Sequence, residues 1–368
     1  MKIWWKKHPF LSGFALFSLL CLCLFAVFPH FPAFSEWFSR NIASAVRLSL
    51  GALSSLVPFS LFEFLIVLFA GYLLFLFGYT LAFFFRKKEM RKAKRLTALF
   101  LVVPITLFSV LDIFILSFAS SYYRVSTASH LDLATEEVAE DEIFFALECL
   151  IDEVNLSAQS LPTNEKGESL SPSLKKIKKE VNLACTQFGE KHSFYQKTGF
   201  PAKSFLSSPL MTYTHISGIF GFFTGEANVN TNYPHFIVTA SLAHESCHAR
   251  GIAPENECNF LAAVILMESN NAYLRYCGAS FLLDDFLSLC QKIDKERCKR
   301  LAETVSPVYF RDMAFYSDFF EPYRESTAAK VADSTNSAYL KSMGQEEGTL
   351  SYSRIIRLSA AYFQQNKG

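Results

Sequence analysis

The chain has 368 residues, with 35 Lys and Arg against 34 Asp and Glu, for a formal net charge of +1. Hydrophobic residues make up 51% of it and charged residues 19%, compared with the roughly 25% charged residues of ordinary soluble domains. This composition excludes a disordered chain, a collagen and a coiled coil, and the near-zero net charge argues against a nucleic-acid partner.

The charges are distributed unevenly along the chain. Residues 1–119 hold 12 Lys and Arg against 4 Asp and Glu, whereas residues 120–368 hold 23 against 30. A basic, apolar N-terminal third is therefore joined to a longer acidic part. We expect two domains with this boundary: a transmembrane region over residues 1–119 and a polar domain over residues 120–368.

Three apolar runs, each long enough to cross a hydrocarbon core of about 30 Å, predict three spans. They cover residues 9–31, 59–85 and 96–119. Asp112 lies inside the third run, and we expect its carboxyl group to face other helices rather than lipid. The first run could instead be a signal peptide. Its apolar stretch is too long for one, and Pro32 begins a poor cleavage site, so an uncleaved anchor is favoured.

Seven basic side chains in residues 86–95, between the second and third runs, determine the predicted orientation. By the positive-inside rule this loop is cytoplasmic. The preceding connection carries two basic residues, Arg40 and Arg47. Three crossings then place the polar domain outside, so we expect a multi-pass protein of the cell membrane with an extracytoplasmic C-terminal domain.

The polar domain is predicted to be mostly helical. Amphipathic patterns favour helices over residues 136–154 and 173–188, and several more fill residues 236–368. A short strand is expected over residues 227–230, after a turn at Thr224-Gly225-Glu226.

An H-E-x-x-H motif lies at residues 244–248, at the end of an apolar run that favours a helix. Four residues apart on a helix, His244 and His248 project from one face and can bind one zinc ion. Glu245 leans toward the metal without ligating it, and can act as the general base. Gly251 suits a left-handed helix end. The alternative is two histidines on a helix that binds no metal.

A catalytic zinc ion needs a third protein ligand. Position 254 is Pro, so no histidine follows at the metzincin spacing. Glu255 and Asn259 are four apart and share a helix face, so Glu255 can ligate while Asn259 orients a ligand imidazole. Glu257 remains the alternative ligand.

Residues 244–262 resemble the conserved block of an uncharacterised bacterial family of three-span membrane proteins, classified as a domain of unknown function. The likeness continues at Ser120-Ser-Tyr-Tyr-Arg124 and Ser217-Gly-Ile-Phe220, and then at Thr224-Gly-Glu-Ala-Asn-Val-Asn230. Toward the C-terminus it includes Tyr339-Leu-Lys-Ser-Met-Gly-Gln345 and Gly348-Thr-Leu-Ser-Tyr352. Cys258 stands where the family usually has Ala.

This resemblance implies a mainly α protein, with an N-terminal transmembrane helix bundle followed by an α+β zincin-like (gluzincin) extracytoplasmic domain. More distant gluzincins, among them thermolysin-like and antirepressor-cleaving peptidases, carry an E-x-x-x-D/N pattern whose Glu ligates zinc, and this similarity supports Glu255. In such peptidases an edge strand binds the substrate backbone, which here implies residues 224–230, with Asn228 as a substrate contact. The oxyanion-stabilising residue stays open among five candidates: Tyr352, Tyr339, Arg324, His215 and His235.

The function expected from these patterns is that of a membrane-anchored zinc metallopeptidase. His244, His248 and Glu255 hold Zn²⁺, Glu245 is the general base, and the partners are the lipid bilayer and a peptide or protein substrate. The alternative is a membrane sensor or binding protein that retains the zinc site without turnover. A third option is a metal with a purely structural role.

Overall fold

The computed structural model describes residues 8–85, 90–136, 138–345 and 349–367, with only the backbone for residues 85, 90–94 and 349–353. The chain divides into two compact units. The membrane unit comprises residues 1–124 together with 221–226, and the polar unit comprises residues 125–220 and 227–368. The boundary thus lies five residues beyond the expected one, and one short segment from the middle of the chain joins the membrane unit.

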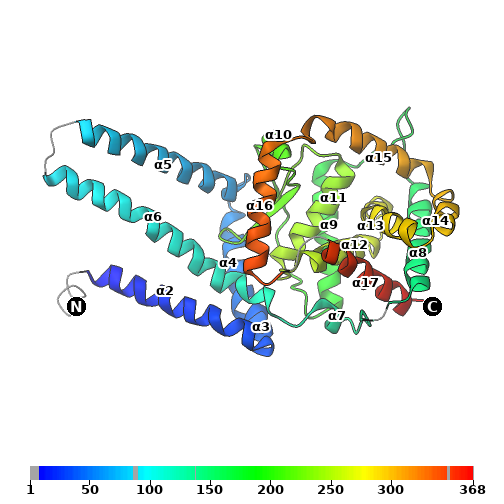
Figure 1. The fold of residues 1–368 in the computed structure, drawn as a ribbon, viewed down its shortest axis with the longest axis horizontal. Coiled ribbons are helices and arrows are strands. Elements are labelled where there is room, and N and C mark those ends of the chain that lie inside the picture. The colour runs from blue at the N-terminus through cyan, green and yellow to red at the C-terminus, as the bar shows by residue number, and fades with distance from the viewer. Residues whose placement is uncertain (1–7, 86–89, 137, 346–348, 368) are drawn as a thin grey trace. The chain divides into compact units, whose positions relative to one another are not determined.

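The membrane unit contains three helices long and apolar enough to cross a membrane (Figure 1). They are Pro9–His30, Leu61–Phe84 and Arg95–Ser117, with mean hydropathies of 2.5, 2.3 and 2.6. The three predicted spans are therefore confirmed as candidate membrane helices. Residues 86–89 of the basic loop lie outside the described residues, and the backbone is helical again from Met90.

Over its described residues, the membrane unit contains the spans and their connections in the following order. The elements are α2 (Pro9–Val27), η1 (Phe28–His30), α3 (Pro32–Phe38), the π-helix η2 (Ser39–Ala43), α4 (Ser44–Ser54), α5 (Leu61–Phe85), α6 (Met90–Ser117) and η3 (Ala119–Tyr122). Asp112 of α6 is 3% exposed and accepts a hydrogen bond from Ser18 Oγ of α2 at 2.7 Å. The intramembrane carboxyl group thus faces a neighbouring helix, as expected, because lipid offers it no hydrogen-bond donor.

The segment from Gly221 to Glu226 is held inside the membrane unit by packing and by backbone capping. The Phe223 ring lies 5.0 Å from that of Phe62, measured between centroids. The buried Glu226 carboxylate accepts hydrogen bonds from the backbone N–H groups of Leu61 and Phe62, at 3.2 and 2.7 Å. These are first-turn donors of α5 that have no partner within the helix, so Glu226 caps this span from about 160 residues away in sequence.

Gly225 illustrates how closely the same segment approaches α4. Its φ is +67°, and a Cβ there would lie 2.6 Å from Gly51 N and 2.7 Å from the Arg47 carbonyl oxygen. Only glycine accommodates both the left-handed backbone and the contact.

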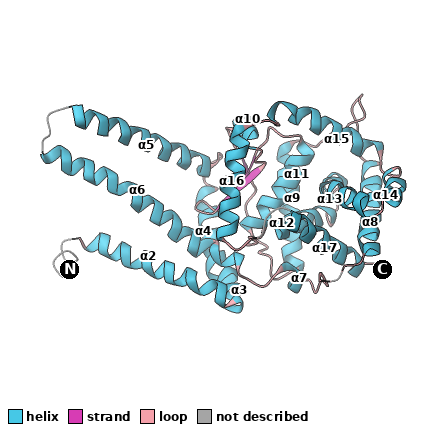
Figure 2. Ribbon diagram, viewed as in Figure 1, coloured by secondary structure: helices cyan, strands magenta, loops and turns pink. Residues whose placement is uncertain are grey.

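The polar unit is mainly helical, as predicted, and Figure 2 shows that its strands are few and short. Its elements are α7 (Thr127–His130), α8 (Glu140–Ala158), α9 (Leu174–Lys191), β1 (Lys203–Ser204), α10 (Ser208–Met211), η4 (Thr212–Thr214), β2 (Gly218–Gly221), β3 (Glu226–Val229), α11 (His235–Ala249), α12 (Glu255–Met267), α13 (Ala272–Ile293), α14 (Lys295–Ala302), α15 (Pro307–Phe320), η5 (Glu321–Tyr323), α16 (Thr327–Ser342) and α17 (Thr349–Gln365).

The three strands form one sheet in the order β1-β3-β2. β1 pairs with β3 in parallel, with Lys203 opposite Asn228 and Ser204 opposite Val229. The prediction that residues 224–230 supply an edge strand is therefore wrong. β3 is the central strand, because β2 lies along one of its edges and the two-residue strand β1 pairs with the other. The edges belong to β1 and β2.

Helix α11 lies at the centre of the polar unit and packs against α9, α12 and α13. It is apolar on most of its circumference, and Val238, Leu242, Ala243 and Cys247 are each at most 1% exposed. A helix with so wide an apolar surface must be covered by its neighbours. The helix that carries H-E-x-x-H is consequently held rigidly by its neighbours, which is what a site with fixed geometry requires.

Candidate metal centre

Two structural features bring the two histidines and the following helix together. His244 and His248 lie one turn apart on α11, which ends at Ala249. Gly251 follows with φ of +93°, and its N–H donates to the His248 carbonyl oxygen at 3.0 Å. This left-handed end reverses the chain, as predicted, so that α12 can begin at Glu255 only four residues later.

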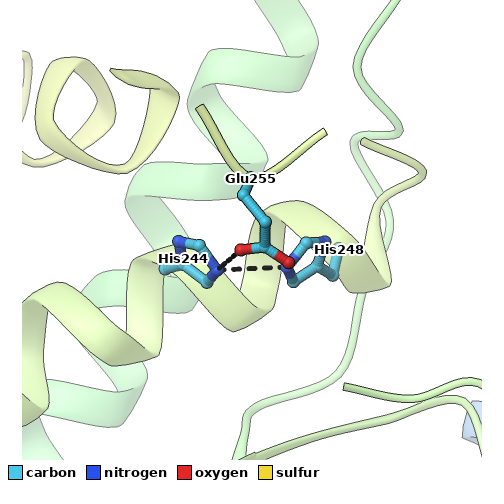
Figure 3. A group of neighbouring side chains, drawn as sticks. All are labelled: His244, His248 and Glu255. Atoms are coloured by element: carbon cyan, nitrogen blue, oxygen red, sulfur yellow. Dashed lines mark hydrogen bonds and ion pairs between the residues drawn. The ribbon is translucent and has the colours of Figure 1, made fainter. Parts of the chain in front are cut away.

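The side chains of His244, His248 and Glu255 converge on one point (Figure 3). The two Nε2 atoms are 3.0 Å apart. Glu255 Oε2 lies 3.1 Å from His244 Nε2, and Oε1 lies 3.5 Å from His248 Nε2. Tetrahedral zinc with bonds of about 2.0–2.1 Å places its ligand atoms about 3.3–3.4 Å apart, so these spacings fit such an ion.

The opposite nitrogen of each imidazole is held by an oxygen acceptor. His244 Nδ1 lies 2.7 Å from Asn259 Oδ1, and His248 Nδ1 lies 2.9 Å from the Ile252 carbonyl oxygen. A carbonyl oxygen can only accept, so each Nδ1 carries the proton and each Nε2 presents its lone pair to the convergence point. This is the tautomer that metal-binding histidines need.

The two candidate third ligands are placed differently. Glu255 is in the convergent group, whereas the Glu257 carboxylate accepts a hydrogen bond from Thr127 Oγ1 at 2.5 Å. On a helix, residues two apart point in different directions, which explains the separation. Asn259, one turn after Glu255, reaches back to His244 instead.

Without an ion, a proton on Nε2 can take the place of the metal, and the imidazoles, when charged in this way, interact with the Glu255 carboxylate. Burial raises the pKa of Glu255, but the charges and hydrogen bonds of the two imidazoles outweigh it and hold that pKa well below its usual range. Burial lowers the pKa of His248, and the Glu255 carboxylate more than offsets this, so the net shift is upward. Two nitrogens and one carboxylate form the donor set of a catalytic zinc site that keeps an open position. The residues present therefore fit zinc.

Glu245 lies beside this group but is not part of it. Its side chain is 5% exposed, and burial raises its pKa to about 8. The charge of His244 and a hydrogen bond from the Phe220 N–H oppose this rise in the pKa, whereas the charge of Glu255 adds to it. Its Oε2 has no hydrogen-bond partner among the described residues. A buried carboxylate oxygen without a donor is rare in folded proteins and calls for an explanation.

Strand β2 passes directly against Glu245, a contact that the sequence did not reveal. A Cβ on Gly218 would lie 2.5 Å from Glu245 Cγ and 2.6 Å from its Oε1. Gly218 thus leaves room for the carboxylate, while Phe220 in the same strand donates to it. The resemblance at residues 217–220 was the only signal available, and it did not indicate this role.

Cys258 is a buried residue that packs on His248, with Sγ 3.3 Å from Nδ1.

Asn228 is not among the residues that form the convergent group. It is fully buried in the central strand, and its Nδ2 donates to the Ile219 carbonyl oxygen at 3.5 Å. Among the oxyanion candidates, His215 lines the same cavity as Glu255 and Asn259. His235 Nδ1 lies 2.6 Å from Ser171 Oγ. The side chain of Tyr352 lies outside the described residues. Substrate contact by Asn228 stays a prediction.

Comparisons with known proteins give a family but no activity. No curated protein matches the chain, and no solved structure matches it. One family model, described as a protein of unknown function (DUF3810), matches residues 38–359, which include all three ligand candidates and most of the membrane unit. Since this match covers far more than half of the sequence, the chain belongs to the DUF3810 family of proteins of unknown function.

Proposed function

We propose that this protein is a membrane-anchored zinc-dependent peptidase. The observation that carries the proposal is the convergence of His244, His248 and Glu255, with both imidazoles held at Nδ1, beside a buried carboxylate that is not a ligand. When bound, zinc would supply Lewis-acid polarisation of the scissile carbonyl group and a lowered pKa of the attacking water.

The chain's own residues account for the proton transfers. Glu245 Oε2 has no hydrogen-bond partner among the described residues, so it is available to accept the proton of the attacking water. Burial favours the neutral form of this carboxyl group, so once protonated it can hold the proton and then donate it to the leaving amine. Gly218 and Phe220 position the carboxylate, and Asn259 fixes the His244 ring.

Glu245 also distinguishes a peptidase from the two alternative functions, a structural zinc site and a sensor. A structural zinc site needs ligands only and is closed by four of them. A sensor that merely binds the ion has no use for a desolvated carboxylate at its side, which costs stability. Retention of such a group next to an open three-ligand site favours turnover.

We further propose that the polar unit lies outside the cytoplasm. The support is the cluster of seven basic residues in positions 86–95, between the second and third spans. Enzymatic reporters fused after Gly368 test this. Activity of a reporter that works only outside the cytoplasm is expected, and activity of a cytoplasmic reporter alone would reject the orientation.

Two substitutions in the purified full-length protein test the peptidase. Glu245→Gln keeps the size and hydrogen bonding of the side chain but removes the proton acceptor. It should retain zinc and lose peptide hydrolysis by about 10²–10⁴-fold. His244→Ala should lose zinc and hydrolysis together. Glu257→Gln, on the same helix turn as Glu255, is the matched control and should keep both. Equal hydrolysis by Glu245→Gln and wild type would refute the assignment.

A further inference from the structure

A cavity of about 910 Å³ opens beside the candidate metal centre, wholly within the polar unit. Glu255 and Asn259 of α12 form part of its wall. Another part comes from Phe236, Ile237 and Ala240 of α11, one to two turns before His244. A peptide whose scissile bond lay at the metal centre would therefore place an adjacent side chain in this cavity. Binding pockets for ligand groups typically have this size and concave form.

Part of the cavity wall is aromatic. Tyr233, Phe236, Tyr316 and Phe320 line it together. Their rings contact one another: the Tyr316 and Phe320 centroids are 5.8 Å apart, and those of Phe236 and Tyr316 are 6.3 Å apart. Such a wall suits the methylene stem of a long side chain and also attracts a cation over its ring faces.

Three carboxylates also line the cavity. Asp284 and Asp285 of α13 and Asp333 of α16 line the cavity, and no Lys or Arg does so among its described lining residues. None of the three carboxylates forms an ion pair or hydrogen bond within the described part of the chain. Burial, followed by the charge of Asp284, raises the pKa of Asp285 to about 6.

A buried serine on the same helix adds a polar side chain to the cavity wall. Ser280 is 5% exposed and lines the cavity, and its hydroxyl group interacts with that of Tyr276. Asp284 and Asp333 are exposed, whereas Asp285 is partly buried, and a partly buried carboxylate without a donor is costly to keep unless a bound group supplies one.

We propose that this cavity binds a lysine or arginine side chain of the peptide substrate, with Asp284 and Asp285 accepting from its cationic head and the aromatic wall packing on its stem. This inference rests on the proposed peptidase function, because it assigns the substrate class of the same site. Charge-assisted hydrogen bonds in such a partly desolvated place are the strong ones.

The first test is a peptide library hydrolysed by the zinc-loaded, full-length protein. One position is varied among Lys, Arg, Phe, Glu and norleucine, which has the lysine stem without the charge. We expect kcat/KM for Lys over norleucine to exceed about 10-fold, and this ratio to fall toward one in Asp285→Asn and in the double variant with Asp284→Asn. Asp152→Asn, at an exposed position on α8, is the control and should keep the ratio.

The second test measures binding without turnover and separates this proposal from the peptidase itself. Glu245→Gln is titrated with the Lys and norleucine peptides, with and without Asp285→Asn. Preferential binding of the Lys peptide that disappears with Asp285→Asn supports the pocket, even if wild type hydrolyses nothing and the peptidase fails. Hydrolysis with no preference for Lys or Arg, or with a preference for Phe that Asp285→Asn leaves unchanged, overturns the pocket while the peptidase stands. Equal binding of both peptides likewise overturns it.

Discussion

Replacing Asp285 with asparagine should stabilise the protein at neutral pH and remove part of its pH dependence. Burial and the neighbouring Asp284 raise the pKa of Asp285 from 3.8 to about 6. Between about pH 4 and pH 6 the folded state therefore binds more protons than the unfolded state. Stability falls as the pH rises through this window, and the penalty is fully present above it.

The size of the effect follows from the shift. About two pKa units at about 1.4 kcal/mol each give roughly 3 kcal/mol. Because the Asp285 side chain is only partly buried, solvent screening reduces this to about 1–2 kcal/mol. Asp285→Asn should raise the melting temperature of the polar unit by about 2–6 °C at pH 7, and the gain should vanish near pH 4.

The assay is thermal unfolding of the full-length protein in detergent at several pH values, with Asp152→Asn as the matched control. Only the difference between variant and wild type is used, so protonation of the histidines, common to both, cancels. A destabilised variant at pH 7, or a gain that does not change between pH 4 and pH 7, would show that Asp285 is solvated or already paired. The argument for a cation-binding cavity would then lose its electrostatic basis.

Three further predictions concern individual contacts. Asn259→Ala removes the acceptor that holds His244 Nδ1 and should weaken zinc binding by about 10–100-fold, measured by competition with a chelator; an unchanged affinity would contradict its orienting role. Glu255→Ala should lower zinc affinity at least as much, whereas Glu257→Ala should change it less, and the reverse order would exchange the two assignments. Glu226→Ala leaves two N–H groups of α5 without their acceptor and should lower the free energy of unfolding by about 1–3 kcal/mol, whereas Glu226→Gln should lower it less. Equal stability of wild type and both variants would argue against the cap.

What the sequence predicted well was local. The spacing of His244 and His248 is a property of one helix turn, and Gly251 marks where that helix ends. Long uncharged runs identified the candidate spans, because length and hydropathy alone decide whether a helix can cross a membrane. Glu255 and Asn259 share a face for the same local reason, and the structure places both at the two imidazoles.

What the sequence did not predict depends on contacts between distant segments. β1 has two residues, too few to produce a pattern, yet its pairing makes β3 the central strand and left the edge-strand prediction wrong. Glu226 caps a helix whose sequence gives no sign of it. The sequence gives no sign that Gly218 contacts Glu245. No periodicity within one segment can report such partners.

The aromatic and acidic walls of the cavity were missed for a related reason. Tyr316 and Phe320 belong to α15, and Asp285 belongs to α13, so the sequence shows each of them only as a member of its own helix. Only the packing of α13 and α15 around α11 gathers them beside the metal ligands.

The central claim is that zinc at His244, His248 and Glu255 supports peptide hydrolysis. The most direct test follows zinc content and hydrolysis in one preparation of the full-length protein, through removal of the metal by a chelator and its stepwise return. Hydrolysis should disappear with the zinc and be restored in full at one zinc per chain. A protein that binds one zinc and hydrolyses no peptide, or one whose hydrolysis is indifferent to zinc, would contradict the account.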